Sequence, residues 1–371
     1  MNYYDQLASI AWDDVNLSIY SKSANDVRKA LLAEQPTLED FKALISPAAE
    51  PFLEQMAVKS QQITRTRFGN TMSLYIPLYL SNLCANVCTY CGFSMDNRIK
   101  RKVLTVEEIE KEVDVIVGMK FDSVLLVTGE HETKVGLEYF KQVVPVIKKR
   151  INYVALEVQP MQQQAYQELV SLGVDAVMVY QETYHPSTYA QHHLRGNKRD
   201  FEFRVNTPDR LARAGVKKIG LGALIGLEDW RVDTFLTASH LNYMERNYWK
   251  SSYSISFPRI RPCEGSITPK SNMSDKQLVQ LICAYRIFNQ QVELSLSTRE
   301  SPKFRDNVLS LGITNMSAAS KTQPGGYASN QEELEQFAIS DERSALIVAD
   351  SIMKAGLHPV WTDWDKVYSG K

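Results

Sequence analysis

The chain has 371 residues, of which 44% are hydrophobic and 23% charged, with a formal net charge of -1. This is an ordinary globular composition, and it leaves room for one barrel of roughly 250 residues with additions. No net basic field points to nucleic acid, and no long apolar run or basic-then-apolar leader is present, so we expect a cytoplasmic protein that binds neither nucleic acid nor membranes.

The first 70 residues predict a helical amino-terminal extension. Amphipathic patterns run over Ala24–Ala33 and Pro51–Arg67, and no long Gly/Ser/Pro linker follows them. We therefore expect residues 1–70 to pack on the main domain.

Residues 71–330 follow a different rhythm, in which short β-rich runs alternate with helical patterns such as Val106–Met119 and Leu137–Lys149. Repeated about eight times, this alternation predicts an α/β fold, a (β/α)8 TIM-type barrel, with an open doubly wound sheet as the rival. In both folds ligands gather at the carboxyl ends of the strands. The predicted strands are Ser73–Leu80, Ser123–Thr128, Tyr153–Gln159, Ala176–Gln181, Lys218–Leu224, Tyr253–Phe257, Glu293–Ser297 and Ile313–Ser317.

Residues 331–371 form a C-terminal segment that we expect to pack on the barrel. Its aromatic end, from His358 to Trp364, is either a cover for one barrel mouth or a packing strand or turn.

Three of the five cysteines, Cys84, Cys88 and Cys91, follow the first predicted strand with the spacing C-x3-C-x2-C. An odd cysteine count with this clustering argues against a disulfide framework. Three thiolates on a short loop can hold one 4Fe–4S cluster, and they leave one iron without a protein ligand. An open coordination position lets a metal centre bind a cofactor or substrate.

Two other interpretations of these cysteines are less favourable. They could share one face of a core helix, but Asn82, Asn86 and Gly92 make such a helix poor. A zinc site would want a fourth ligand, and the first histidine along the chain is His131.

The cysteine spacing, with Tyr90 just before the third cysteine, resembles the signature of the radical S-adenosylmethionine superfamily. Further segments make nearly the whole chain similar to the 2-iminoacetate synthase family, the tyrosine lyases of thiamine biosynthesis. These segments are Leu80–Asn86, Leu126–His131, Tyr180–His185, Ser297–Glu300 and Lys321–Tyr327.

The resemblance implies a 4Fe–4S cluster and S-adenosyl-L-methionine as cofactors. In the superfamily a Gly-Gly-Glu segment meets the methionine amino group, and here Thr128 replaces its first glycine. Polar residues at the ends of the third and fourth strands would hold the ribose and methionine. The candidate cofactor-binding residues are Tyr90, Thr128, Gly129, Glu130, Glu157, Gln159, Gln181, Glu182, Arg195, for the cofactor carboxylate, and Leu224, whose backbone could meet the adenine.

Substrate binding is expected around Arg299, just after the seventh strand, because a guanidinium suits an amino acid carboxylate. Related lyases add a serine from the next strand, for which Ser317 and Ser320 are the options. The alternative for Arg299 is an ion pair with Glu300 or another neighbour.

The resemblance implies that an electron passes through the cluster to the sulfonium, giving methionine and a 5′-deoxyadenosyl radical. This radical would take a hydrogen from the amino group of L-tyrosine, and cleavage of the Cα–Cβ bond would give 2-iminoacetate and 4-methylphenol. Thiazole synthase would receive the imine, and a flavodoxin or ferredoxin would donate the electron.

Three alternatives remain open at this point. A hydrogenase-maturation tyrosine lyase carries a second cysteine cluster near its C-terminus, whereas this chain has no cysteine after Cys283. A tryptophan lyase differs in pocket shape, which the sequence does not give. A non-catalytic metal-binding scaffold would need the cysteines but not the polar strand ends.

Overall fold

The centre of the molecule is a closed barrel of eight parallel strands. The computed structural model describes residues 2–263, 267–329 and 335–362. Neighbouring strands follow the order β1, β3, β4, β5, β7, β8, β9 and β10, and β10 pairs with β1 to close the barrel. The bounds are β1 Thr71–Ser81, β3 Ser123–Thr128, β4 Tyr153–Glu157, β5 Ala176–Met178, β7 Lys218–Leu221, β8 Ser252–Ser256, β9 Glu293–Leu296 and β10 Asn315–Ser317.

The prediction of a (β/α)8 barrel is confirmed, and the open sheet is excluded by the pairing of Ser73–Tyr75 with Asn315–Ser317. Several strands are shorter than predicted at their carboxyl ends. The third predicted strand, for example, ends at Glu157 instead of Gln159. The reason is that the chain leaves the sheet there to line the pocket described below.

Helices alternate with the strands along the barrel. The predicted helices over 106–119 and 137–149 match α6 and α7 to within one residue. Thr105 caps α6, because its hydroxyl accepts from the backbone of Glu108 while the Glu108 carboxylate accepts from the backbone of Thr105. The bounds are α6 Val106–Gly118, α7 Leu137–Lys148, α8 Gln163–Ser171, α9 Pro186–His192, η2 Asn197–Arg199, α10 Phe201–Val205, α11 Thr207–Arg213, α12 Trp230–Asn247, α13 Asp275–Phe288, α14 Pro302–Val308 and α15 Ala345–Lys354.

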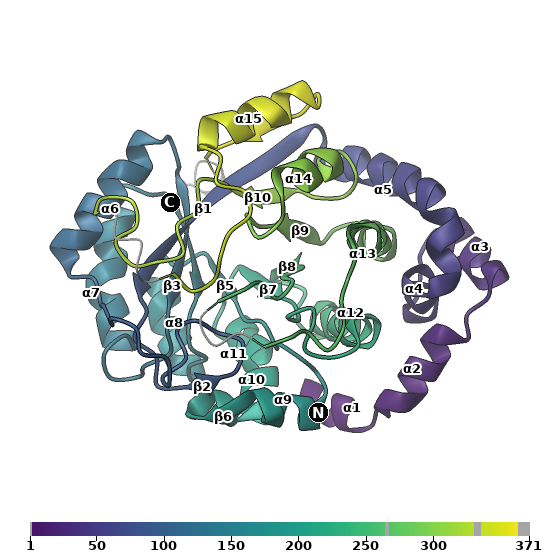
Figure 1. Cartoon of the computed structure of the whole chain (residues 1–371), viewed down its shortest axis with the longest axis horizontal. Coiled ribbons are helices and arrows are strands. Elements are labelled where there is room, and N and C mark those ends of the chain that lie inside the picture. The colour runs from purple at the N-terminus through teal and green to yellow at the C-terminus, as the bar shows by residue number, and fades with distance from the viewer. Residues whose placement is uncertain (1, 264–266, 330–334, 363–371) are drawn as a thin grey trace.

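The amino-terminal helices form an outer arc beside α12 and α13 (Figure 1). Buried hydrogen bonds anchor the arc, since the Tyr3 hydroxyl donates to the Leu236 carbonyl and the Gln280 amide donates to the carbonyls of Leu44 and Ser46. The arc shares one hydrophobic core with the barrel. Its bounds are α1 Tyr3–Ala8, α2 Trp12–Tyr20, α3 Ala24–Leu32, α4 Leu38–Ile45, η1 Pro47–Phe52 and α5 Leu53–Phe68.

The C-terminal segment contacts both ends of the barrel. Gln336 and Phe337 line the pocket at the carboxyl ends of the strands. The short strand β11, His358–Val360, pairs instead with the first residues of β1. The aromatic end is therefore a packing strand over His358–Val360, and Asp363 and Trp364 lie outside the described residues.

The division of the chain into 1–70, 71–330 and 331–371 stays a prediction. Among the described residues, no helix is both long and apolar enough to cross a membrane.

Candidate active site

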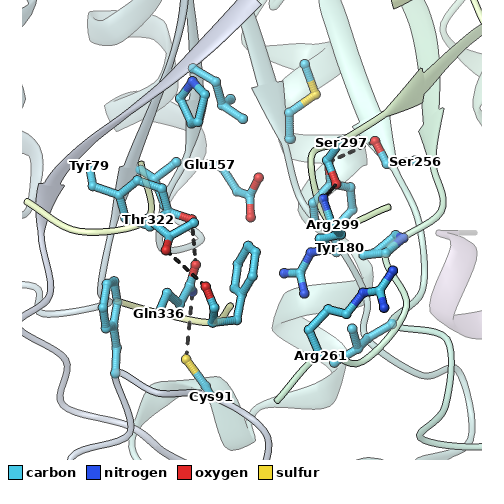
Figure 2. Close-up of a pocket in the computed structure, with 18 of the residues that line it drawn as sticks. Tyr79, Cys91, Glu157, Tyr180, Ser256, Arg261, Ser297, Arg299, Thr322 and Gln336 are labelled. Atoms are coloured by element: carbon cyan, nitrogen blue, oxygen red, sulfur yellow. Dashed lines mark hydrogen bonds between the residues drawn. The ribbon is translucent and has the colours of Figure 1, made fainter. Parts of the chain in front are cut away.

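One pocket opens at the carboxyl ends of the barrel strands, where the fold places ligands (Figure 2). It gathers residues from segments far apart in the sequence. Of the predicted site residues, the pocket is lined by Cys84, Cys88, Tyr90, Cys91, Thr128, Gly129, Glu130, Glu157, Glu182, Leu224, Arg299, Ser317 and Ser320.

Three predicted cofactor ligands, Gln159, Gln181 and Arg195, do not line this pocket. The Arg195 side chain is 56% exposed and pairs with Asp96. Gln159 and Gln181 are buried, but away from the pocket lining. Position 181 lies between Tyr180 and Glu182, which do line the pocket, so its side chain is directed away from the pocket lining.

The cysteine loop is shaped by one guanidinium that sequence analysis missed. Arg101 donates from Nη1 to the carbonyls of Asn82 and Phe93 at 2.9 and 2.8 Å, and from Nη2 to those of Ser94 and Asn97 at 2.6 and 3.1 Å. A single cation thereby satisfies carbonyls on both sides of the three cysteines. The loop is therefore built by hydrogen bonds rather than as a helix.

A second strand pair fixes the middle of the loop. In it β2, Val87–Cys88, pairs antiparallel with β6, His193–Arg195. At Gly129 the loop meets β3 so closely that a Cβ would lie 2.3 Å from the Leu83 carbonyl oxygen. Glycine is thus required at this position of the Thr-Gly-Glu segment, in order to let the backbone pass.

The three cysteine thiols fit a cluster. All three are free and line the same pocket. Burial raises the pKa of Cys84 to about 11 and also raises the pKa of Cys88 and Cys91, while the charge of Lys198 opposes the shift at Cys88 and Cys91. Buried thiols of this kind stay protonated until metal charge stabilises the thiolates.

A single metal ion fits this donor set less well. Within the described parts of the chain, no three Cys, His, Asp or Glu side chains are grouped closely enough to hold one ion. Ligands of a cubane cluster bind separate irons, so three thiols spread around one pocket agree with the 4Fe–4S prediction and not with a zinc site.

A buried charge network lies beside the cysteines. Arg204 pairs with Glu130 at 3.0 Å and with Glu182 at 3.5 Å, and Lys198 pairs with Glu182 at 2.7 Å. Burial disfavours the Glu130 carboxylate, but Arg204, Lys198 and the Asn86 amide outweigh it, so the pKa of Glu130 is lowered. Glu130, Lys198 and Arg204 are therefore charged at neutral pH.

Glu182 has a backbone φ of +71°, which is uncommon for a residue other than glycine. Its carbonyl accepts from the Leu224 N–H at 2.8 Å, and its carboxylate pairs with Lys198 and Arg204. Left-handed backbone at such a position costs roughly 1–3 kcal/mol and is found most often at ligand sites.

Tyr90 is held by a histidine of fixed tautomer. His193 Nδ1 lies 2.7 Å from the Tyr189 carbonyl, which can only accept, so Nδ1 carries the proton. Nε2 must then accept from the Tyr90 hydroxyl, also at 2.7 Å. Burial lowers the pKa of His193 to about 2, which keeps this imidazole neutral.

Arg299 is not bound to Glu300, contrary to the alternative raised by the sequence. Glu300 pairs instead with Arg259 and Arg261. Arg299 lies over the Phe337 ring with its guanidinium carbon 3.4 Å from the centroid, and its one hydrogen bond to another part of the described chain is a 3.5 Å contact with the Arg259 carbonyl. Figure 2 shows the guanidinium directed into the pocket.

Other polar groups near Arg299 are also available. Glu157 points into the pocket in Figure 2, and within the described residues no hydrogen bond reaches its carboxylate. Burial raises the pKa of Glu157 to about 7, against the opposing charge of Arg299. Ser317 accepts from the Thr298 backbone at 3.1 Å, whereas the buried Ser320 hydroxyl has no partner in the described chain.

The pocket contains two sets of residues with different partners. The cysteine group is Cys84, Cys88, Cys91, Glu130, Glu182, Lys198 and Arg204, and the arginine group is Glu157, Arg299, Ser317 and Ser320.

Sequence analysis missed Lys198, Arg204 and Gln336, all of which line the pocket. Arg204 lies on the short helix α10, among residues with no motif. The sequence shows only that residue 204 is basic. Its burial on the helix becomes visible only in the fold.

Comparisons with known proteins agree with this geometry. Residues 78–238 match the radical SAM superfamily, and residues 256–358 match the biotin and thiamin synthesis associated domain. The chain is 56% identical to 2-iminoacetate synthase of Escherichia coli over 100% of this chain and 98% of the relative. It is also 56% identical to 2-iminoacetate synthase of Salmonella typhimurium, over 98% of this chain and 97% of the relative.

Solved structures with the same fold include HydG, a maturase of the [FeFe]-hydrogenase, at 30% identity and a TM-score of 0.84, covering 96% of this chain and 78% of that one. Methylornithine synthase has the fold at 22% identity and a TM-score of 0.74, covering 90% of this chain and 97% of that one. With this pocket and the full-length similarity, the chain belongs to the 2-iminoacetate synthase family of radical S-adenosylmethionine enzymes, which use a 4Fe–4S cluster and S-adenosylmethionine.

Proposed function

We propose that this enzyme cleaves the Cα–Cβ bond of L-tyrosine to 2-iminoacetate and 4-methylphenol. S-adenosylmethionine becomes methionine and 5′-deoxyadenosine, with uptake of two electrons and one proton. The observation that carries the proposal is that one pocket contains both the three cysteines and Arg299, a guanidinium with no carboxylate partner in the described chain.

Cys84, Cys88 and Cys91 would hold the cluster. When bound, the cluster and S-adenosylmethionine supply an electron and a carbon radical that removes a hydrogen atom from the substrate. The buried side chains that surround the pocket exclude water, and other molecules with C–H groups, from that reaction.

The charged partners of the cysteine group would bind the amino acid part of S-adenosylmethionine. Glu130 suits its ammonium group, and Lys198 or Arg204 suits its carboxylate, because both cations line the pocket. These two residues replace Arg195, which the fold places on the surface. Tyr90 and Leu224 remain the proposed contacts for the adenine, and Thr128 and Gly129 for the methionine.

The arginine group would bind tyrosine. Arg299 can form two parallel hydrogen bonds to the substrate carboxylate, and the free Ser320 hydroxyl can add a third, with Ser317 beside it. Fixing the carboxylate orients the amino group and the Cα–Cβ bond. Glu157 lies at the meeting of the two groups and suits a ribose hydroxyl.

The proposed partners are those that the family resemblance implies. The imine hydrolyses readily, so delivery to thiazole synthase in thiamine biosynthesis is the proposed fate. A flavodoxin or ferredoxin would supply the electrons. Free thiols and a reduced cluster suit the cytoplasm, where disulfides are rare.

The test is anaerobic incubation of the reconstituted enzyme with S-adenosylmethionine, a reductant and either tyrosine or tryptophan, with products identified by mass spectrometry. We expect 4-methylphenol from tyrosine in amounts matching 5′-deoxyadenosine. Indole products from tryptophan would instead assign a tryptophan lyase, and cyanide with carbon monoxide would assign the hydrogenase-maturation activity. A colourless protein containing zinc would favour the scaffold.

A further inference from the structure

The side chain of Gln336 makes two directed hydrogen bonds in the pocket. Its Nε2 lies 3.7 Å from the Cys91 sulfur, a contact drawn in Figure 2, and its Oε1 accepts from the Tyr79 hydroxyl at 2.7 Å. A cluster-bound thiolate can only accept, so it favours the N–H end of the amide, and the Tyr79 hydroxyl donates to the oxygen at the other end. An N–H donor is therefore held against one of the three cysteines.

The backbone of Gln336 is held equally firmly. Its N–H donates to the Thr322 carbonyl at 2.9 Å, and its carbonyl accepts from the Gly92 N–H at 3.1 Å. At Gly92 a Cβ would lie 2.5 Å from that carbonyl oxygen. Glycine directly after Cys91 thus lets the C-terminal segment approach the cysteine loop.

We propose that Gln336 is a positioning residue for the cluster, whose amide donates to the Cys91 thiolate and raises the potential at which the bound cluster accepts an electron. This inference rests on the cluster assignment of the proposed function but not on the identity of the substrate.

The physical reason is charge. Reduction adds one electron to the cluster, with no bond made and no proton moved, and an external low-potential reductant supplies the electron. The added negative charge spreads onto the thiolate sulfurs, so an N–H donor stabilises the reduced state more than the oxidised one. Such partners of a metal ligand tune its chemistry without touching the metal.

The same segment also reaches the arginine group, because the next residue, Phe337, stacks on Arg299. The Thr322 hydroxyl donates to the Phe337 carbonyl at 3.0 Å and so ties this residue to the barrel. Gln336 therefore lies where a single turn of chain touches both parts of the pocket.

The experiment is a redox titration of the anaerobically reconstituted full chain, followed by the electron paramagnetic resonance signal of the reduced cluster. We expect Gln336→Leu to bind the same amount of iron but to have a lower midpoint potential. The equilibrium constant for reduction should fall about tenfold, which is about 59 mV for a one-electron couple. Gln336→Glu keeps the size of the side chain and should lower the potential at least as far.

Two further variants calibrate the result. Tyr79→Phe leaves the N–H donor in place but frees its orientation, so its potential should fall by less. Gln290→Leu removes an exposed amide that pairs with Arg67 outside the pocket, and its potential should match the wild type.

Unchanged potentials in both Gln336 variants, with full iron content, would overturn the inference. A wild-type chain that binds no cluster would instead overturn the proposed function.

Discussion

The cysteine group and the arginine group differ in how many of their polar atoms are already bonded. Glu130, Glu182, Lys198 and Arg204 neutralise one another in the protein itself. Glu157, Arg299 and Ser320 have no such partners within the described chain. The cysteine group is therefore preorganised by the fold, whereas the arginine group gains most of its partners from the ligand.

The largest expected effect tests the cysteines themselves. Replacing Cys84, Cys88 or Cys91 by alanine should abolish iron binding and turnover, because each would leave an iron without its ligand. Iron analysis and visible absorption measure iron binding, and product formation measures turnover. Cys283→Ala is the matched control, since this thiol is buried in the core away from the pocket and its loss should leave iron content unchanged.

Arg204→Met should break the preorganised network. It leaves Glu130 and Glu182 short of a buried cation, so we expect a loss of about 3–5 kcal/mol in the free energy of unfolding. Urea unfolding of the metal-free protein measures this. Arg195→Met removes an exposed pair and should cost about 1 kcal/mol or less. Equal losses in the two variants would contradict the contrast drawn above.

Arg299→Met should behave in the opposite way. No carboxylate is left behind in the described chain, so we expect the free energy of unfolding to change by less than about 1 kcal/mol. Tyrosine affinity should fall roughly 30–150-fold, because a charged hydrogen-bonded contact contributes about 2–3 kcal/mol. Calorimetric titration measures the affinity. Arg299→Lys keeps the charge but cannot form the two parallel hydrogen bonds, so its tyrosine affinity should lie between those of the wild type and Arg299→Met.

Glu157→Gln should change the pH dependence of stability. The folded chain holds this proton more tightly than the unfolded chain, because burial raises the pKa of Glu157 to about 7 from 4.5. The wild type should therefore lose stability relative to Glu157→Gln as the pH rises from about 4.5 to 7, by about 2 kcal/mol with the partial solvent access of the pocket allowed for. Parallel pH profiles of the two unfolding free energies would show instead that Glu157 titrates normally.

The sequence predicted the parts of the site that local pattern determines. The cysteine spacing and the polar residues Glu130 and Arg299 directly follow strands, and strand ends converge in a barrel whatever its details. It named Arg195 for the cofactor carboxylate and did not name Arg204, which is also basic and lies nine positions further along the chain. Which of them turns inward depends on how β6 and α10 pack, and that packing is a tertiary property with no local signal.

Gln336 illustrates the same limit over a longer range. It reaches Cys91 from 245 positions away along the chain, through a segment with no regular structure at that point. Neither residue periodicity nor turn chemistry predicts such a contact. The need for glycine at position 92 can be explained only once the contact is known.

Arg101 has a consequence for how the enzyme acquires its inorganic centre. Its guanidinium donates to four carbonyls of the loop, so the protein's own hydrogen bonds hold the backbone that carries the thiols. Cluster binding then requires little folding of the loop. A zinc finger differs, because its chain folds only around its ion. A carrier protein would transfer an intact cluster to a loop whose backbone is already held by hydrogen bonds.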